Sequence, residues 1–163
     1  MSNPNIVSFQ ARLDEFYFLG IENIIAENAD FGAFWNNFFD KGGYDVIAPY
    51  QTDANCINIW FNSESGEKLY CQGKFVNASA KVPDGYTLRR FASGDYMVTT
   101  TDWLPSYEES MHHINHDYYK NAKTPAGYRT RGENDAGIFL IERWGEKTDM
   151  GYRYEFWVPI EKM

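Results

Sequence analysis

One carboxylate, Glu155, lies within an aromatic segment near the C-terminus. Side chains alternate between the two faces of a strand, so in an extended segment Glu155 shares a face with Arg153 and Trp157. A buried carboxylate without a partner is costly and tends to take up a proton, whereas a lipophilic cation keeps it ionised. Neighbouring Trp and Tyr rings would add about 0.5–2 kcal/mol each by cation–π attraction. The spacing predicts a cation-binding pocket at Glu155; the alternative is an exposed strand carboxylate.

Aromatic side chains that suit the walls of such a pocket recur along the chain, and Phe, Tyr and Trp make up 18% of the residues. For each of them, packing in the core is the alternative. A second acid, Glu142, stands in a neighbouring strand-like segment, where an exposed strand charge beside Arg143 is the alternative. The aromatic residues that we expect to line the pocket are Trp60, Tyr70, Tyr96, Trp103, Trp144 and Trp157.

Three histidines lie close together in the sequence. His112 and His116 have the i,i+4 spacing with which two side chains on one helix face bind zinc. The glutamate of a zincin motif is missing, because position 113 is a histidine, and no third ligand suggests itself. We favour a solvated helix face and predict no metal site. The sequence also has no Gly-x-Ser-x-Gly elbow, P-loop or dinucleotide fingerprint, and no cofactor is expected.

The charge balance argues against nucleic acid as a direct partner. The chain carries 23 acidic and 15 basic residues, a net charge of −8, which repels a phosphate backbone. No apolar stretch approaches the roughly 20 residues that span a bilayer, and the N-terminus does not read as a signal peptide. Cys56 and Cys71 lack CxxC spacing, so we expect buried thiols in a reducing compartment rather than a disulfide. We expect a cytoplasmic monomer with no membrane partner.

The first half of the chain predicts a strand, a helix and a strand pair. Apolar residues within 30–39 follow helical spacing, and Gly42 and Gly43 end that helix. The segment 62–66 has the composition of a hairpin turn. The predicted strands are Phe9–Ile21, Cys56–Phe61 and Lys68–Phe75.

The second half repeats this order. Leu104 and Pro105 should open a helix that runs to about Asn121, because proline suits a first helical turn. Pro159 lacks a ladder donor, so its strand should end there or lie at an edge. The predicted strands are a single strand bent around residues 92–94 and built from Tyr86–Phe91 and Asp95–Thr101, then Ile138–Trp144 and Tyr152–Ile160.

Two βαββ units, over residues of about 8–80 and 81–163, predict one α+β domain. We expect a mostly antiparallel sheet with the helices on one side and a ligand cleft between the halves. In the last strand, one face should meet the helices and the face with Glu155 should look toward the cleft. The side chains expected to meet the helices are Tyr154, Phe156, Val158 and Ile160.

The motifs in this order resemble the GyrI-like domains, also known as the effector-binding domains of bacterial transcription activators of the AraC and MerR types. The resemblance covers nearly the whole chain. Phe91 and Ser93 depart from the family's Pro-Ala-Gly-x-Tyr turn, which often has Pro and Ala at these positions. The matching segments are Ile57–Phe61, Glu67–Tyr70, Phe91–Tyr96, Ile141–Trp144 and Tyr154–Ile160.

The resemblance implies a small-molecule-binding domain. The regulators carry a fused DNA-binding helix-turn-helix, for which this chain has no room, so the resemblance implies a stand-alone sensor or sequestering module. Members of the family use a glutamate on the final strand to bind cationic aromatic compounds, and Glu155 matches that position. The alternative is a hydrolase of electrophilic small molecules, with Glu155 as general base and Tyr70 or Tyr96 positioning water. A protein-interaction module that works through the acidic surface is a third hypothesis. We expect a binder rather than an enzyme.

Overall fold

The computed structural model describes residues 5–121 and 124–163, with the side chains of residues 5–114 and 124–163. These residues form two α-helices and one nine-stranded sheet, which confirms the predicted α+β class. The helices are α1 (Phe31–Asp40) and α2 (Tyr107–Asn121), and a short 3₁₀ turn spans Ala48–Tyr50. The strands are β1 (Ile6–Leu13), β2 (Phe16–Ile24), β3 (Cys56–Asn62), β4 (Lys68–Val76), β5 (Thr87–Phe91), β6 (Gly94–Thr101), β7 (Tyr128–Thr130), β8 (Gly137–Trp144) and β9 (Glu155–Lys162).

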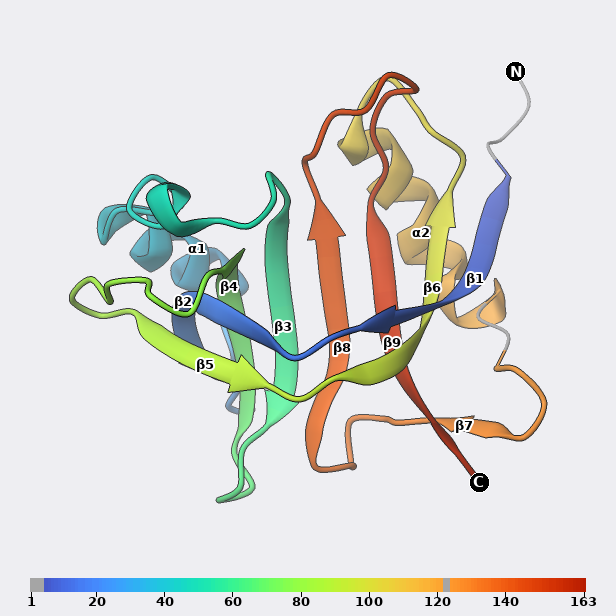
Figure 1. Ribbon diagram of the computed structural model, residues 1–163, viewed down its shortest axis with the longest axis horizontal. Coiled ribbons are helices and arrows are strands. Elements are labelled where there is room, and N and C mark those ends of the chain that lie inside the picture. The colour runs from blue at the N-terminus through green and yellow to red at the C-terminus, as the bar shows by residue number, and fades with distance from the viewer. Residues whose placement is uncertain (1–4, 122–123) are drawn as a thin grey trace.

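Every strand pair of the described sheet is antiparallel. The order is β1-β6-β9-β8-β3-β4-β2-β5, and β7 pairs with β9. Strands β1 and β6 thus lie at one end of the sheet, and β2 and β5 at the other. The chain crosses between these ends twice, from β1 to β2 and from β5 to β6, on the face opposite the helices (Figure 1).

Two segments that we predicted as single strands are each divided in the structure. The prediction of one strand over Phe9–Ile21 is wrong, because the chain breaks at the exposed Asp14 and Glu15, so that β1 pairs with β6 while β2 pairs with β4 and β5. Residues Ala92 and Ser93 likewise separate β5 from β6, which join opposite ends of the sheet. The alternation shifts by one residue at the first break, because the same face of the sheet receives Phe9, Ala11 and Leu13 from β1 but Phe16 and Phe18 from β2. The alternation does not show which strand each segment pairs with.

Both predicted helices form, and side-chain caps mark where they begin. Asp30 accepts a hydrogen bond from the backbone of Ala33 at 3.1 Å at the start of α1. Helix α2 begins later than predicted, because Ser106 accepts a hydrogen bond from the backbone N–H of Glu109 at 3.2 Å. Pro105 therefore lies before the helix rather than in its first turn. Neither described helix is long and apolar enough to cross a membrane.

The helices pack on one face of the sheet. Phe38 of α1 is buried in a cluster with Leu19 and Ile21 of β2. Ile114 of α2 is buried in a second cluster with Tyr154, Phe156 and Val158. The expected alternation in the last strand is confirmed for these three residues, because the intervening Trp157 belongs to a cluster on the other face.

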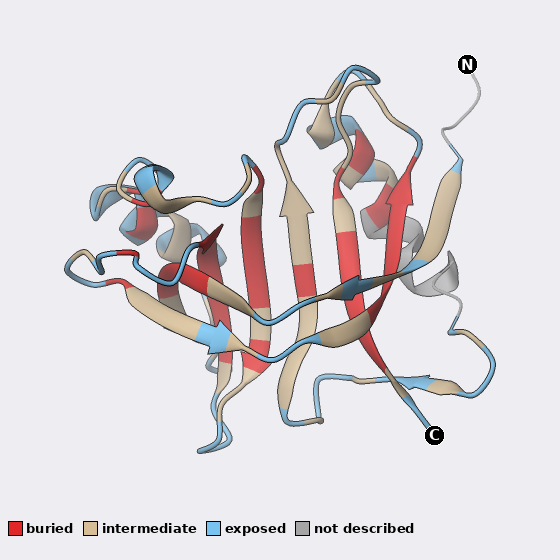
Figure 2. Ribbon diagram, viewed as in Figure 1, coloured by how far each residue is buried: buried red, intermediate tan, exposed pale blue. Residues whose placement is uncertain are grey.

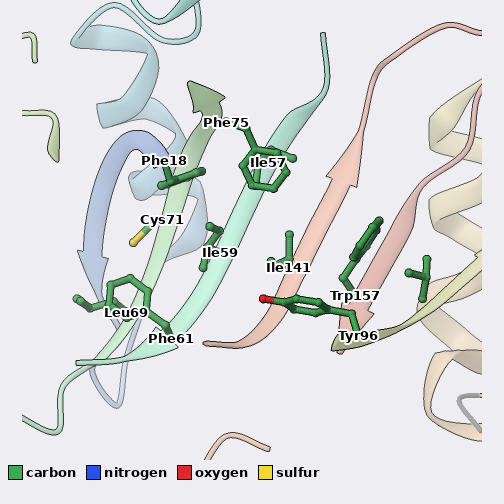
Figure 3. Close-up of a cluster of buried hydrophobic side chains, with 11 residues drawn as sticks. Phe18, Ile57, Ile59, Phe61, Leu69, Cys71, Phe75, Tyr96, Ile141 and Trp157 are labelled. Carbon is green, nitrogen blue, oxygen red and sulfur yellow. The ribbon is translucent and has the colours of Figure 1, made fainter. Parts of the chain in front are cut away.

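That other face is filled with apolar side chains, as Figure 3 shows for the central strands. Trp157 and Tyr96 lie there with side chains from β3, β4 and β8, and the central strands are the most buried part of the molecule (Figure 2). Partly buried residues of the crossing segments, including Phe9, Phe16 and Phe91, cover this cluster. The face on which we expected an open cleft is therefore largely occupied by core packing.

Pro159 lies inside β9 rather than at its end or at a sheet edge, since β9 continues to Lys162 and has neighbours on both sides. Its carbonyl accepts a hydrogen bond from the backbone N–H of Arg131 at 2.8 Å. On that side β8 pairs only as far as Trp157, and β7 begins to pair at Ile160. Pro159, which has no N–H, therefore lies between the part of β9 that pairs with β8 and the part that pairs with β7, so no backbone hydrogen bond between strands is lost.

Close backbone approach makes glycine necessary where β2 and β4 meet. Gly20 and Gly73 are directly opposite, and a Cβ at Gly73 would lie 2.1 Å from the carbonyl oxygen of Leu19. We expect Gly73→Ala to lower the free energy of unfolding by about 1–3 kcal/mol or more, measured by urea denaturation, because the sheet backbone cannot yield without losing its ladder. Gly132→Ala is the matched control, since no heavy atom lies within 4 Å of its added Cβ. Equal stability of the two variants would contradict this account.

Candidate functional site

A cavity of about 380 Å³ lies on the helix side of the sheet and is lined by residues of α1, α2, β3 and β8, among others. In Figure 1, α1 and α2 lie behind the sheet, on either side of β3 and β8. The floor comes from the strands, and each helix contributes one wall. Its volume is within the range of small-molecule sites, about 300–1,000 Å³. Its lining residues are Phe31, Trp35, Asn58, Trp60, Tyr70, Tyr107, Met111, Glu142, Trp144 and Tyr154.

Glu142 is the acidic residue of this cavity, and three fixed donors hold its carboxylate. Its Oε2 accepts hydrogen bonds from Asn58 Nδ2 at 3.1 Å and from Trp60 Nε1 at 2.9 Å. Its Oε1 accepts a hydrogen bond from the Tyr154 hydroxyl at 3.1 Å. A carboxylate has about four acceptor positions, so most of them are already used. The charge is oriented and partly stabilised without an opposite charge.

Burial dominates the electrostatics of the site. It raises the pKa of Glu142 above its usual value, while the hydrogen bonds from Trp60, Asn58 and Tyr154 act in the opposite direction. Burial also raises the pKa of Tyr154 and Tyr70, and the Glu142 charge adds to both. Among the described side chains, no lysine or arginine forms an ion pair with Glu142. The carboxylate is thus half-buried, open to the cavity and unmatched by a cationic side chain of the described residues.

Aromatic rings surround the carboxylate in two groups. On one side, the ring centroids of Trp60 and Tyr70 are 4.6 Å apart, and Phe31 of α1 lies 5.5 Å from Trp60. On the other side, Trp144 stacks on Tyr154 with centroids 5.1 Å apart and an interplanar angle of 15°. These faces offer apolar surface and negative ring potential to a flat or cationic ligand.

The register of the central strands brings these groups together. Asn58 of β3 is directly opposite Glu142 of β8, and Trp60 is opposite Tyr70 of β4. Direct cross-strand partners share a face of the sheet, and so do residues two apart on one strand. The polar floor therefore follows from the pairing of β3 with β8, which are far apart in the sequence.

The structure divides the eight residues that we predicted as ligand contacts among three cavities. Glu142, Trp60, Tyr70 and Trp144 line the cavity described above. On the other side of the sheet, Glu155, Trp157 and Trp103 line a smaller cavity of about 250 Å³. Tyr96 lines a third cavity between the β5–β6 turn and the end of β9. Contact of any of these residues with a ligand stays a prediction, but the structure does not bring Glu155 and Glu142 into one site.

Glu155 differs from Glu142 in having its charge matched. Its Oε2 accepts a hydrogen bond from Arg153 Nε at 3.0 Å, and its Oε1 accepts one from Trp157 Nε1 at 3.0 Å. The Arg153 guanidinium also lies 4.1 Å from the ring centroid of Trp103. A cationic side chain of the protein therefore occupies the position beside this carboxylate and its aromatic neighbour.

Several lining residues were not among the predicted contacts. Phe31 and Trp35 on α1 are four residues apart, as are Tyr107 and Met111 on α2, so each pair presents one helix face to the cavity. Helical periodicity alone does not distinguish helix residues that line a cavity from helix residues that pack in the core. Exposure does give a signal at Phe31, which is 37% exposed although it lies on the apolar side of α1. The other missed residues are Asn58 and Tyr154.

The histidine pair considered as a metal site lies partly outside the described side chains. His112 is on α2, whereas the side chain of His116 is not described. In the described part of the chain, no group of three or more His, Cys, Asp or Glu residues could hold a metal ion. Cys56 and Cys71 are free thiols, as expected.

No protein-family model and no curated protein matches the chain, but solved structures do. An integron cassette protein, VCH_CASS2, from the mobile metagenome of Vibrio cholerae is 11% identical, with a TM-score of 0.61 over 96% of this chain and 99% of that one. A putative bacterial transcription regulation protein from Staphylococcus aureus is 14% identical, with a TM-score of 0.62 over 95% and 98%. SAV2435, in a structure with tetraphenylphosphonium bound, is 20% identical, with a TM-score of 0.60 over 95% and 94%.

These likenesses extend over nearly the whole chain and over nearly the whole of each matched protein. They show that the chain has the GyrI-like effector-binding fold, which confirms the fold that its motifs indicate. At such low identity, the likeness concerns the path of the backbone and not the ligand.

The raised pKa of Glu142 predicts a specific pH dependence of stability. A carboxyl group whose pKa is higher in the folded state than in the unfolded state loses folding stability as pH rises from its ordinary value, 4.5, to its folded value. We expect Glu142→Gln to remove this loss, so that the variant gains urea resistance relative to wild type as pH rises through that window. Glu64→Gln removes the same formal charge from the exposed β3–β4 turn and should leave the wild-type curve unchanged. A pH-independent difference between wild type and Glu142→Gln would contradict the assignment.

Proposed function

We propose that this chain, which has the GyrI-like effector-binding fold, binds one hydrophobic cationic aromatic molecule in the cavity between α1 and α2. The observation that carries the proposal is the state of Glu142, which is half-buried, held by three donors and unmatched by any described lysine or arginine. A cation in the cavity would supply the missing opposite charge. The chain would then act as the sensor or sequestering part of a small-molecule response.

The walls of the cavity suit a ligand of this kind. A permanent cation with aromatic groups loses little hydration on entering an apolar site, whereas a small inorganic cation loses much. Contact with the faces of Trp60 and Trp144, which line opposite sides of Glu142, would add about 0.5–2 kcal/mol each when water is excluded. Met111 adds a polarizable and adaptable side chain, which helps a site accept ligands of different shapes.

Both halves of the domain would enclose the ligand. The first βαββ unit would contribute α1 together with Trp60 and Tyr70, and the second would contribute α2 together with Glu142, Trp144 and Tyr154. The presence of tetraphenylphosphonium, a lipophilic aromatic cation, on the structurally similar SAV2435 supports the same ligand class.

Glu142 is a better candidate for the central carboxylate than Glu155. Arg153 already pairs with Glu155, so a cationic ligand would have to displace that guanidinium. Glu142 needs no such exchange, and its cavity is the larger of the two. We therefore place the ligand on the helix side of the sheet.

Binding of tetraphenylphosphonium or rhodamine 6G, followed by quenching of Trp fluorescence and by calorimetry, tests this proposal. We expect micromolar affinity, about −8 kcal/mol, for the wild type. Glu142→Gln keeps the shape of the side chain and should weaken binding at least tenfold, about 1.4 kcal/mol. Glu155→Gln should change it much less, and the exposed Glu64→Gln should not change it. Tight binding by Glu142→Gln together with loss in Glu155→Gln would move the site to the other face of the sheet.

The pH dependence of binding offers a second test. Only the ionised carboxylate attracts a permanent cation, so affinity for tetraphenylphosphonium should fall as pH falls through the raised pKa of Glu142. This cation does not titrate, and the change would therefore come from the protein. Calorimetry in buffers of different ionisation enthalpy should detect proton release on binding near that pH. The Glu142→Gln variant should show neither effect, and an equal pH dependence in the variant would refute the role of Glu142.

A hydrolase function has one specific observation in its favour. The hydroxyl-bearing Tyr70 lies in the same cavity as Glu142, whose raised pKa suits a general base. Tyr96, the other tyrosine considered for this role, lies in a different cavity. Incubation with a neutral electrophile, such as an aryl epoxide, separates the two functions. Turnover that is lost in both Glu142→Gln and Tyr70→Phe would favour the hydrolase, whereas cation binding without turnover would favour the binder.

A further inference from the structure

A row of polar side chains runs across the helix-side face of the sheet and ends at the cavity. It contains Asn23 of β2, Gln72 of β4 and Asn58 of β3, which are 8%, 0% and 3% exposed. It continues to Glu142 of β8 and to Tyr154, the residue before β9, through the hydrogen bonds described above. Buried amides are costly unless they are paired, and packing between the two helix-backed clusters does not require polar side chains. The row therefore calls for an explanation beyond packing.

The direction of the first amide in the row is set by the backbone. Asn23 Nδ2 donates to the carbonyl oxygen of Tyr70 at 2.9 Å and to Gln72 Oε1 at 2.7 Å. A carbonyl oxygen only accepts, so the nitrogen of Asn23 must be the atom that meets it. The same nitrogen then requires the oxygen of Gln72 to face Asn23. The Gln72 Nε2 group is consequently left for the other side of the row.

The next two side chains in the row are neighbours, and each has one unused polar atom. Gln72 Nε2 and Asn58 Oδ1 are both buried, and neither forms a hydrogen bond within the described part of the chain. Gln72 and Asn58 are direct cross-strand neighbours, so their side chains leave the same face from Cβ atoms about 4.5–5.5 Å apart. One atom is a donor and the other an acceptor. The opposite orientation of Asn58 would place two donors together at Gln72 and two acceptors together at Glu142.

We propose that Gln72 is a positioning residue for the cavity carboxylate, acting through Asn58. Its Nε2 group orients the Asn58 amide so that nitrogen, and not oxygen, meets Glu142 Oε2. In this way the carbonyl oxygen of Tyr70, which fixes the orientation of the Asn23 amide, also fixes the orientation of the amides between Asn23 and Glu142. The inference deepens the proposed function, because it identifies what orients the donor that stabilises the ionised form of the central carboxylate. It rests on the proposed function only for its biological meaning.

Loss of this orientation has a predictable effect on Glu142. A donor to the charged form of a carboxyl group lowers its pKa, so removal of the donor raises the pKa further. Asn58→Leu removes the donor itself. Gln72→Met retains the size of the side chain but removes the group that orients Asn58, which leaves the Asn58 amide free to turn its oxygen toward Glu142. The titratable groups that line the same cavity are Tyr70, Tyr107 and Tyr154, while α1 presents the neutral Phe31 and Trp35.

The test is an NMR titration of the Glu142 carboxyl carbon in protein labelled with ¹³C at glutamate, without any ligand, with Glu142→Gln used to assign the resonance. We expect Asn58→Leu to raise the titration midpoint by about one pH unit and Gln72→Met to raise it by about half a unit. In the double variant, the midpoint should equal that of Asn58→Leu, because Gln72 has no further route to Glu142. An unchanged midpoint in Gln72→Met, or an additional shift in the double variant, would overturn the proposal.

Two further measurements guard against a general loss of structure. Thr99→Val removes another buried and unpartnered polar atom, on β6 and outside the cavity lining, and should leave the Glu142 midpoint unchanged. In the unaltered protein, the side-chain amide resonances of both Asn58 and Gln72 should shift with pH, with the same midpoint as the Glu142 carboxyl group. A Gln72 amide resonance that does not change over this pH range would also overturn the proposal. Because no ligand is present, failure of cation binding would leave these results unaffected and would count against the proposed function instead.

Discussion

The enclosed charge of Glu142 is the constraint on which the helix-side face of this domain depends. A carboxylate taken out of water needs donors, which are Asn58 and Trp60 of β3 and Tyr154 just before β9. These donors hold the charge in one place but do not neutralise it, since no described lysine or arginine pairs with it. The site therefore carries an unfavourable free energy that a cation in the cavity would relieve. Polar residues in the middle of central strands, which packing alone would not require, are explained by this one group.

The two faces of the sheet differ in structure: one is covered by apolar packing, and the other carries the cavity. The chain crosses twice over the face opposite the helices, and the side chains of those crossings cover a continuous apolar cluster (Figures 1 and 3). On the helix side, α1 and α2 each pack on a separate cluster around Phe38 and Ile114, and the strip of sheet between them is left open. The packed face holds the strands in register, and this register brings Asn58 opposite Glu142. The rigidity of one face thus positions the binding groups of the other.

Local patterns predicted the elements well, because they depend on neighbours in the sequence. Alternation in the last strand correctly separated Trp157 from Tyr154 and Phe156, and helical spacing located α1 to within a residue or two. The errors lie where the chain changes its pairing partner, because local alternation carries no information about the partner strand. At the break between β1 and β2 and at the one between β5 and β6, the alternation shifts by only one residue, and one strand was predicted where two pair at opposite ends of the sheet.

By itself the sequence determined that this chain forms an α+β domain with the GyrI-like fold, and that carboxylates stand among aromatic residues in its last two long strands. Only the tertiary structure decided which carboxylate lacks a matching charge. Glu155 and Glu142 look alike in a linear pattern, each within two residues of an arginine and two residues from a tryptophan. Folding pairs Glu155 with Arg153 and gives Glu142 three neutral donors and an open cavity. The physical reason is that charge compensation depends on cross-strand register and on which face the rest of the chain covers, and both are long-range properties.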